Sequence, residues 1–265
     1  MQPDRTRWQT LRRDDIARLA SEHATVIVPT GAIEQHGPHL PLDTDSYTAE
    51  GVAGRAAGRA ASPVVVAPTV WWGVSGHWMG FPGTIAVSPS TLETLLVEIA
   101  TGIAAHGFRR VLFLNGHAGN VGALHGACAR LSAAGIRACG LHYWALAHPE
   151  LDDLSTTDGG RIGHAGEIET SLQLHLRPET VGTLPVDGVA TRMPRSVLPP
   201  AFIDAAIMPP DPAAESPSGV YGDPSAASAS LGEAALDIIV QRVAEFLDAF
   251  ARTPLPGQSE VAHVE

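Results

Sequence analysis

The 265-residue sequence contains no lysine, so arginine supplies all 17 of its permanently cationic side chains. This absence excludes catalysis through a Schiff base or a lysine nucleophile. Basic residues are also outnumbered by 28 acidic ones, and the formal net charge is −11. Proteins that bind nucleic acid carry basic stripes that neutralise phosphates. We therefore expect no nucleic acid among the partners.

Cysteine and long apolar runs are scarce as well. Two cysteines, Cys128 and Cys139, do not support a disulfide framework or a cysteine-rich zinc site. No apolar stretch nears the roughly 18 residues that a membrane-spanning helix needs. The first residues lack the charged-then-apolar pattern of a signal peptide. We therefore expect a cytoplasmic protein that makes no membrane contact.

One stretch, residues 31–45, concentrates side chains that can bind metal or move protons. It reads GAIEQHGPHLPLDTD and follows an apolar β-branched run, so it is a loop at the end of a predicted strand. Its titratable residues are Glu34, His36, His39, Asp43 and Asp45. So many such groups in one proline-stiffened loop indicate a metal or catalytic site rather than a polar surface turn.

Predicted strands and helices alternate through the first 180 residues. Strands are expected at 24–29, 64–67, 84–87, 110–114 and 137–143, and helices at 8–22, 45–61, 90–107, 121–134, 167–176 and 231–250. This alternation predicts an α/β fold, a three-layer α/β/α sandwich around a largely parallel sheet. We expect residues 1–265 to form one domain, with 181–230 as an extended arm and 231–250 as a C-terminal helix.

Ligands of such folds bind beyond the carboxyl ends of the strands, where three predicted loops meet. The first loop is 31–45. The second, 69–84, is rich in tryptophan and glycine and carries Ser75 and His77; it is equally consistent with a pocket wall and an oligomer contact. The third, 115–120, carries His117.

These loops, with one helix start, supply a set of metal ligands. Glu34 and His36 are two residues apart and point the same way from an extended backbone. The other candidates are Asp45, His117 and Glu167. Two imidazoles and three carboxylates suit two divalent cations bridged by one carboxylate and one water. Three carboxylates leave two such cations with an excess charge of +1, which lowers the pKa of bound water and suits hydrolysis of an amide-like C–N bond.

Five motifs resemble the creatininase (creatinine amidohydrolase) family: EQHG at 34–37, LDTD at 42–45, FPGT at 81–84, NGH at 115–117 and HAGEIETS at 164–171. The resemblance covers residues 26–222 and indicates a member other than creatininase itself. It implies a three-layer α/β/α fold, two divalent metal ions (Zn and/or Mn, with Fe possible) and hydrolysis of cyclic or linear amides. It also implies a homo-oligomer, a hexamer built as a trimer of dimers.

The resemblance assigns four metal ligands position by position: Glu34, His36, Asp45 (as the bridge) and His117. In creatininase a further metal-binding glutamate lies two residues after the histidine of the third-loop motif, where this chain has Gly119. Other branches of the family also have glycine there and take the ligand from the glutamate that matches Glu167. Glu167 is therefore the expected fifth ligand and part of the catalytic machinery. Glu169 is expected to be structural or to support the ligands.

The residues that face the substrate are assigned in the same way. Ser75 matches a position that contacts substrate, Trp144 matches an aromatic pocket wall, and His164 matches a catalytic histidine. His77 is expected to touch the substrate, although packing is equally consistent.

Creatininase also places a Trp–Asp pair and a glutamate just before its catalytic histidine. Those positions hold Gly160, Arg161 and Gly163 here, so creatinine is a poor candidate substrate. Arg161 is a candidate bidentate donor to a carboxylate or phosphate of the substrate, or simply a solvated loop arginine.

The leading hypothesis is a binuclear amidohydrolase in which a metal-bridged hydroxide attacks a cyclic amide, formamide or other small amide. The alternative is a peptidase acting near the end of a modified precursor peptide, as in mycofactocin maturation. The arm at 181–230 favours the smaller substrate. A non-catalytic metal-binding module is a weaker hypothesis because every candidate ligand is present. A serine hydrolase is weaker still, because Ser75 lacks the Gly-x-Ser-x-Gly elbow.

Overall fold

Four parallel strands form one sheet in the computed structural model, which describes residues 6–157, 163–184 and 212–256. The spatial order is β2-β1-β3-β4, comprising β1 (Thr25–Thr30), β2 (Val64–Val66), β3 (Arg110–Asn115) and β4 (Arg137–His142). In the register, Asn115 lies between Thr30 and His142. The carboxyl ends of the three longer strands are therefore level, and the loops that follow them meet.

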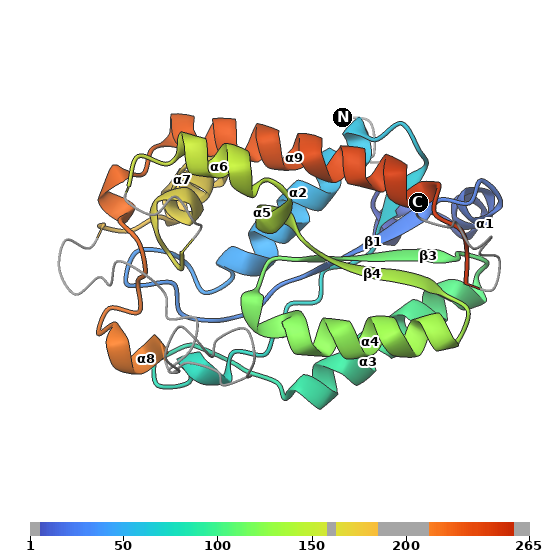
Figure 1. The fold of residues 1–265 in the computed structure, drawn as a ribbon, viewed down its shortest axis with the longest axis horizontal. Helices are drawn as coiled ribbons and strands as arrows, with labels where there is room; N and C mark the ends of the chain where they lie inside the picture. The colour runs from blue at the N-terminus through green and yellow to red at the C-terminus, as the bar shows by residue number, and fades with distance from the viewer. Residues whose placement is uncertain (1–5, 158–162, 185–211, 257–265) are drawn as a thin grey trace, which may run out of the picture.

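Helices cover both faces of this sheet (Figure 1). One layer contains α2 (Thr44–Arg59), α7 (Glu167–Leu176) and α9 (Ala229–Ala251). The other contains α1 (Arg13–Ser21), α3 (Pro89–Ala105) and α4 (Val121–Ala133). The remaining short helices are α5 (Tyr143–Leu146), α6 (His148–Leu154) and α8 (Pro212–Glu215).

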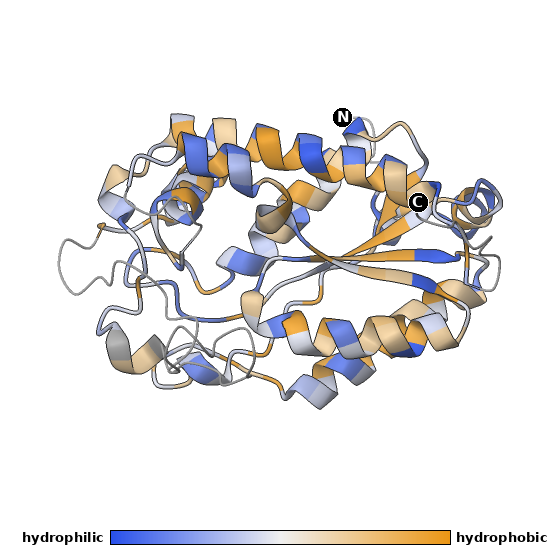
Figure 2. Cartoon of the chain, viewed as in Figure 1, coloured by the Kyte–Doolittle hydropathy of each residue, from blue (hydrophilic) through white to orange (hydrophobic). Residues whose placement is uncertain are grey.

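Alternate strand residues serve two separate hydrophobic cores. Ile27 and Leu112 pack with α2, α7 and α9, whereas Val26 and Phe113 pack with α3 and α4. Both sets are apolar, because a parallel sheet is buried on its two faces. Figure 2 shows this as hydrophobic colour along the strands. The predicted three-layer α/β/α sandwich with a parallel sheet is confirmed.

Two local predictions differ from the structure. The predicted strand at 84–87 does not join the sheet; it makes single bridges, Ile33 with Ile85 and Gly73 with Ala86, and so ties two site loops together. The predicted helix at 8–22 is interrupted and consists of a short 3₁₀ turn, Trp8–Thr10, followed by α1.

The predicted arm at 181–230 lies partly outside the described residues, which omit 185–211. Its described end returns to the site. The backbone of Tyr221 pairs with that of His164 through two hydrogen bonds of 2.9 and 2.8 Å, and both Val220 and Tyr221 are fully buried. The C-terminal helix at 231–250 is observed as α9. Among the described residues, no helix combines the length and apolar character needed to cross a membrane.

Candidate metal centre and active site

The site lies where the loops after β1 and β3 converge on the first turn of α2. The close approach depends on glycine. A Cβ atom at Gly116 would lie 2.5 Å from the carbonyl oxygen of Asp45, and one at Gly119 would lie 2.2 Å from that of Val74. Both distances are far below van der Waals contact, so a larger residue at either position would push the loops apart. Gly119 therefore has no room for a side chain in this arrangement of the loops.

Asp45 lies at the centre of the cluster and contacts a different imidazole with each of its oxygens. Its Oδ1 is 3.0 Å from Nε2 of His36, and its Oδ2 is 3.1 Å from Nδ1 of His117. All three side chains are buried. A carboxylate placed between two separate imidazoles has the arrangement that a bridging ligand requires.

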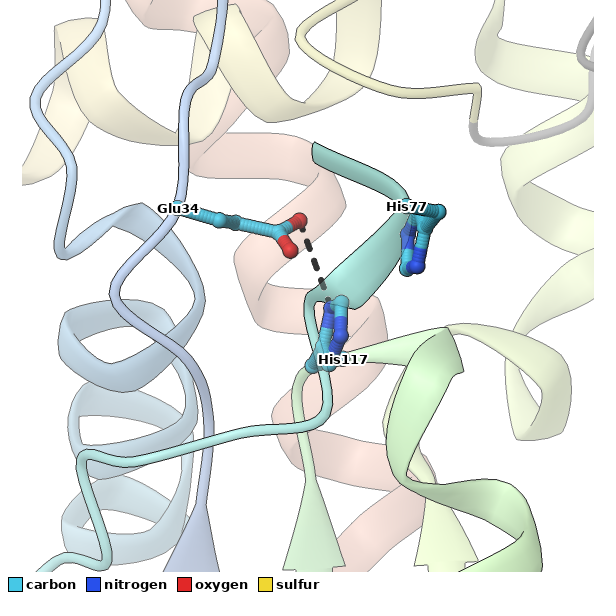
Figure 3. A group of neighbouring side chains, drawn as sticks. All are labelled: Glu34, His77 and His117. Atoms are coloured by element: carbon cyan, nitrogen blue, oxygen red, sulfur yellow. Dashed lines mark ion pairs between the residues drawn. The ribbon is translucent and has the colours of Figure 1, made fainter. Parts of the chain in front are cut away.

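Two further carboxylates flank this centre. Oε1 of Glu34 lies 3.3 Å from Nδ1 of His117 and 3.6 Å from Nδ1 of His164. Oε2 of Glu169 lies 3.8 Å from Nε2 of His36. Figure 3 shows the Glu34 carboxylate directed at His117. Donor atoms of His36, Asp45 and Glu169 lie within 4.8 Å of one another, as do those of Glu34, His77 and His117 and those of Glu34, His36 and His164.

Hydrogen bonds determine which imidazole nitrogen faces the carboxylates. His117 directs its Nε2–H to the carbonyl oxygen of Val74 at 3.0 Å, so Nδ1 is the nitrogen that faces the carboxylates. His36 directs its Nδ1–H to the carbonyl oxygen of Glu34 at 3.2 Å, so Nε2 is the nitrogen that faces Asp45. Metal-binding histidines are commonly oriented in this way by a carbonyl acceptor on the other ring nitrogen.

A further observation indicates that the cluster suits a divalent cation. Oε2 of Glu34 and Oδ2 of Asp45 are buried without a hydrogen-bond partner in the described part of the chain. Unpartnered buried carboxylate oxygens are costly, and a cation among them removes that cost. The 3.1 Å approach of Asp45 Oδ2 to His117 makes an ion pair but no hydrogen bond. Carboxylate oxygens and imidazole nitrogens together suit Zn²⁺ and Mn²⁺.

In the absence of a cation, protons on His36, His117 and Glu169 offset the negative charge of the carboxylates. Burial opposes the charged form of His36, but Asp45, Glu169 and Glu34 outweigh it and raise its pKa to about 10. Burial likewise opposes the charge of His117, and Glu34 and Asp45 raise its pKa well above the ordinary value. Burial raises the pKa of Glu169 to about 7. These shifts indicate a site whose net negative field calls for positive charge.

The structure places Glu169, not Glu167, beside the cluster. The carboxylate of Glu167 accepts hydrogen bonds from the side chains of Ser155, Thr156 and Thr157 and from the backbone of the last two. The two glutamates are two positions apart in α7, or about 200° around a helix, so they point to nearly opposite sides. The expected metal role of Glu167 does not match this geometry.

A cavity of about 100 Å³ opens on the cluster. Some of the residues predicted to contact substrate line this cavity, and others do not. Trp144 and His77 line it, and the His77 ring is almost parallel to that of His117, with 5.8 Å between centroids. Ser75 is not among the lining residues; it is buried behind His117, with Oγ 3.3 Å from its Nε2. Arg161 lies outside the described residues.

His164 also lines the cavity, held by contacts that sequence reasoning did not identify. Its Nε2–H donates to the carbonyl oxygen of Gln35 at 2.8 Å, so Nδ1 faces Glu34 and the cluster. The ring stacks on Trp78, with 4.6 Å between centroids. Burial, followed by the charge of His36, lowers the pKa of His164 to about 3. The ring is therefore neutral near pH 7, and its Nδ1 faces Glu34.

Comparison with known proteins identifies the family. The family model for creatininase, described as creatinine amidohydrolase, matches residues 9–247. The chain belongs to the creatininase family. Its relatives include the mycofactocin precursor peptide peptidase of Mycolicibacterium smegmatis, 39% identical over 82% of this chain and 81% of that protein. The creatinine amidohydrolase of Pseudomonas putida is 31% identical over 86% of this chain and 90% of that protein.

Solved structures of the family agree with the fold. A crystal structure of creatininase is 29% identical, covers 94% of this chain and 99% of its own, and superposes with a TM-score of 0.76. Similar creatininase structures include a Zn–Zn form and an Mn form. This creatininase-family chain is therefore a metal-dependent hydrolase of amide-type C–N bonds.

Proposed function

We propose that the chain hydrolyses its amide substrate with two divalent cations, Zn²⁺ and/or Mn²⁺, held side by side. The observation that carries this proposal is the placement of the Asp45 carboxylate between two imidazoles. One of its oxygens faces His36 and the other faces His117. Glu34 and His117 would complete the first position, and His36 and Glu169 the second. The unpartnered oxygens of Glu34 and Asp45 support the same assignment.

The roles of the chain's own residues follow from their positions. Bound in the cluster, the cations would lower the pKa of a water molecule and polarise the substrate carbonyl. His164 faces that space with Nδ1, while the carbonyl of Gln35 holds its other nitrogen. We assign to His164 the transfer of a proton from the attacking water to the leaving nitrogen. Trp144 lines the cavity and limits the entry of further water.

For the substrate, we propose a peptide bond near the end of a modified precursor peptide. Four relatives that are 35–39% identical are mycofactocin precursor peptide peptidases, whereas the creatinine amidohydrolase is 31% identical. Gly163 in the cavity wall, where creatininase carries a glutamate, also argues against creatinine. The small volume of the cavity, about 100 Å³, keeps a formamide or other small amide as the second candidate.

A direct test uses chelator-treated protein reloaded with Zn²⁺ or Mn²⁺. We expect two metal ions per chain and metal-dependent cleavage of a mycofactocin-type precursor peptide, measured by mass spectrometry, with little turnover of creatinine. Fewer than one bound ion per chain, with no hydrolysis of any amide, would reject the two-metal proposal. Turnover of small amides alone would reject only the peptide substrate. We also infer a homo-oligomer, a hexamer, which sedimentation of the full chain would test.

A further inference from the structure

We propose that Asn120 is a positioning residue that holds His117 as a metal ligand. The inference rests on the two-metal function proposed above. Asn120 does not touch the cluster; it lies in the 3₁₀ turn after His117 and is fully buried. Its side-chain amide forms hydrogen bonds with Val74, Gly31 and Asn115. Each of these residues lies in a segment that carries or contacts a candidate metal ligand.

The oxygen of the Asn120 side chain acts on the ring of His117 through Val74. Oδ1 accepts the backbone N–H of Val74 at 2.9 Å. The carbonyl oxygen of the same Val74 accepts Nε2–H of His117 at 3.0 Å. Asn120 therefore fixes the acceptor that selects the ring tautomer. With Nε2 bound to this acceptor, Nδ1 is the nitrogen that faces Glu34 and Asp45.

The nitrogen of the same side chain acts on the backbone of His117 through Asn115. Nδ2 of Asn120 donates to Oδ1 of Asn115 at 3.1 Å and to the carbonyl oxygen of Gly31 at 3.0 Å. Oδ1 of Asn115 also accepts the backbone N–H of His117 at 3.3 Å, and Nδ2 of Asn115 donates to its carbonyl oxygen at 2.6 Å. Both the ring and the backbone of His117 thus depend on one amide.

This placement predicts an unequal effect on the two cation positions. His117 contributes to the position shared with Glu34, whereas His36 and Glu169 have no hydrogen bond to Asn120. Loss of a partner that orients a ligand typically weakens metal binding by about 10–100-fold. Asn120→Ala should therefore weaken one of two Zn²⁺-binding steps by this factor and leave the other within about threefold.

The experiment is calorimetric titration of chelator-treated protein with Zn²⁺. Asn120→Ala is expected to reproduce the titration of His117→Ala rather than that of Glu169→Ala. Ser88→Ala is the control for general destabilisation, because Oγ of Ser88 caps α3 by accepting the N–H of Thr91 and Ser88 belongs to no candidate ligand group. Equal weakening of both steps, or two steps within threefold of the unsubstituted protein, would overturn the inference.

A second variant and a second readout keep the test decisive. If Asn120→Ala does not fold, Asn120→Asp is judged by the same criterion; it keeps an acceptor for Val74 but loses both Nδ2 bonds. The hydrogen-bonded Nε2–H of His117 should give a slowly exchanging proton signal in the NMR spectrum, with or without metal. That signal should disappear in Asn120→Ala, and its persistence would contradict the role. If the unsubstituted protein binds no Zn²⁺, the proposed function fails and this signal alone decides on Asn120.

Discussion

Oε2 of Glu169 lies 3.8 Å from Nε2 of His36, and the backbone N–H of Ala165 donates to that oxygen at 2.6 Å. This contact brings a third carboxylate to the cluster from α7. We propose that Glu169 replaces the ligand that the glycine at position 119, two residues after His117, cannot supply. Asp45 and Glu169 then enclose His36 Nε2 from two elements.

The first prediction compares the two glutamates of α7. Glu169→Gln removes the charge beside His36, so we expect the protein to lose one of its two bound metal ions and to lose activity by more than about 100-fold, beyond the effect of an outer partner. Glu167→Gln is the matched control, because its carboxylate faces Ser155 and Thr156 instead. Metal analysis by plasma mass spectrometry distinguishes them. Loss of an ion from Glu167→Gln with retention in Glu169→Gln would reverse the assignment.

The second prediction concerns the metal-free protein. The pKa of His36 is raised to about 10 in the folded chain, above its ordinary value of 6.5. A group with a raised folded pKa contributes stability that is complete below about 6.5 and is lost as the pH rises through about 10. The melting temperature of chelated protein should fall across this window. Metal-loaded protein should lack this loss, since the cation replaces the proton; parallel curves for both forms would contradict it.

The third prediction tests the close approach at Gly119. A Cβ there would lie 2.2 Å from the carbonyl oxygen of Val74 and 2.4 Å from Nε2 of His117. Gly119→Ala should lower the free energy of unfolding in urea by about 1–3 kcal/mol, as overpacking does. Gly122→Ala, in α4, is the control, because nothing lies within 4 Å of its Cβ position. That substitution should stabilise by about 0.5–1 kcal/mol.

The fourth prediction separates proton transfer from metal binding. His164→Gln should keep both metal ions and reduce kcat by about 100- to 10,000-fold, the usual range for a general acid or base. His117→Ala, by contrast, should lose one ion. Parallel metal analysis and kinetics of the two variants give the comparison. If His164→Gln also lost an ion, His164 would be a ligand, as its proximity to Glu34 and His36 permits.

Most of the fold and the centre of the site could be predicted from the sequence, because they depend on local patterns. Apolar runs marked β1, β2 and β3, and the two-residue spacing of Glu34 and His36 placed both at one strand end. The cluster brings together His36, Asp45 and His117 as expected. The metal roles of these residues stay predictions until metal is measured.

Other features depended on geometry that sequence spacing does not contain. The choice between Glu167 and Glu169 is set by the rotation of α7, and both lie in one motif. Asn120 was not identified, because its role comes from loops that meet only in the folded chain. The cap of α3 shows the same limit: Pro89 occupies the first helical position, so Ser88 is the cap, although the Ser90–Glu93 spacing resembles a capping box.

The pairing of His164 with Tyr221 bears on how the enzyme is made. A nascent chain of about 200 residues already contains the five residues of the cluster, Glu34, His36, Asp45, His117 and Glu169. Such a chain does not yet contain Tyr221, the backbone partner of His164, or any residue of α9. We therefore expect that truncated chains that stop before Tyr221 leave His164 without this backbone partner and lack hydrolytic activity.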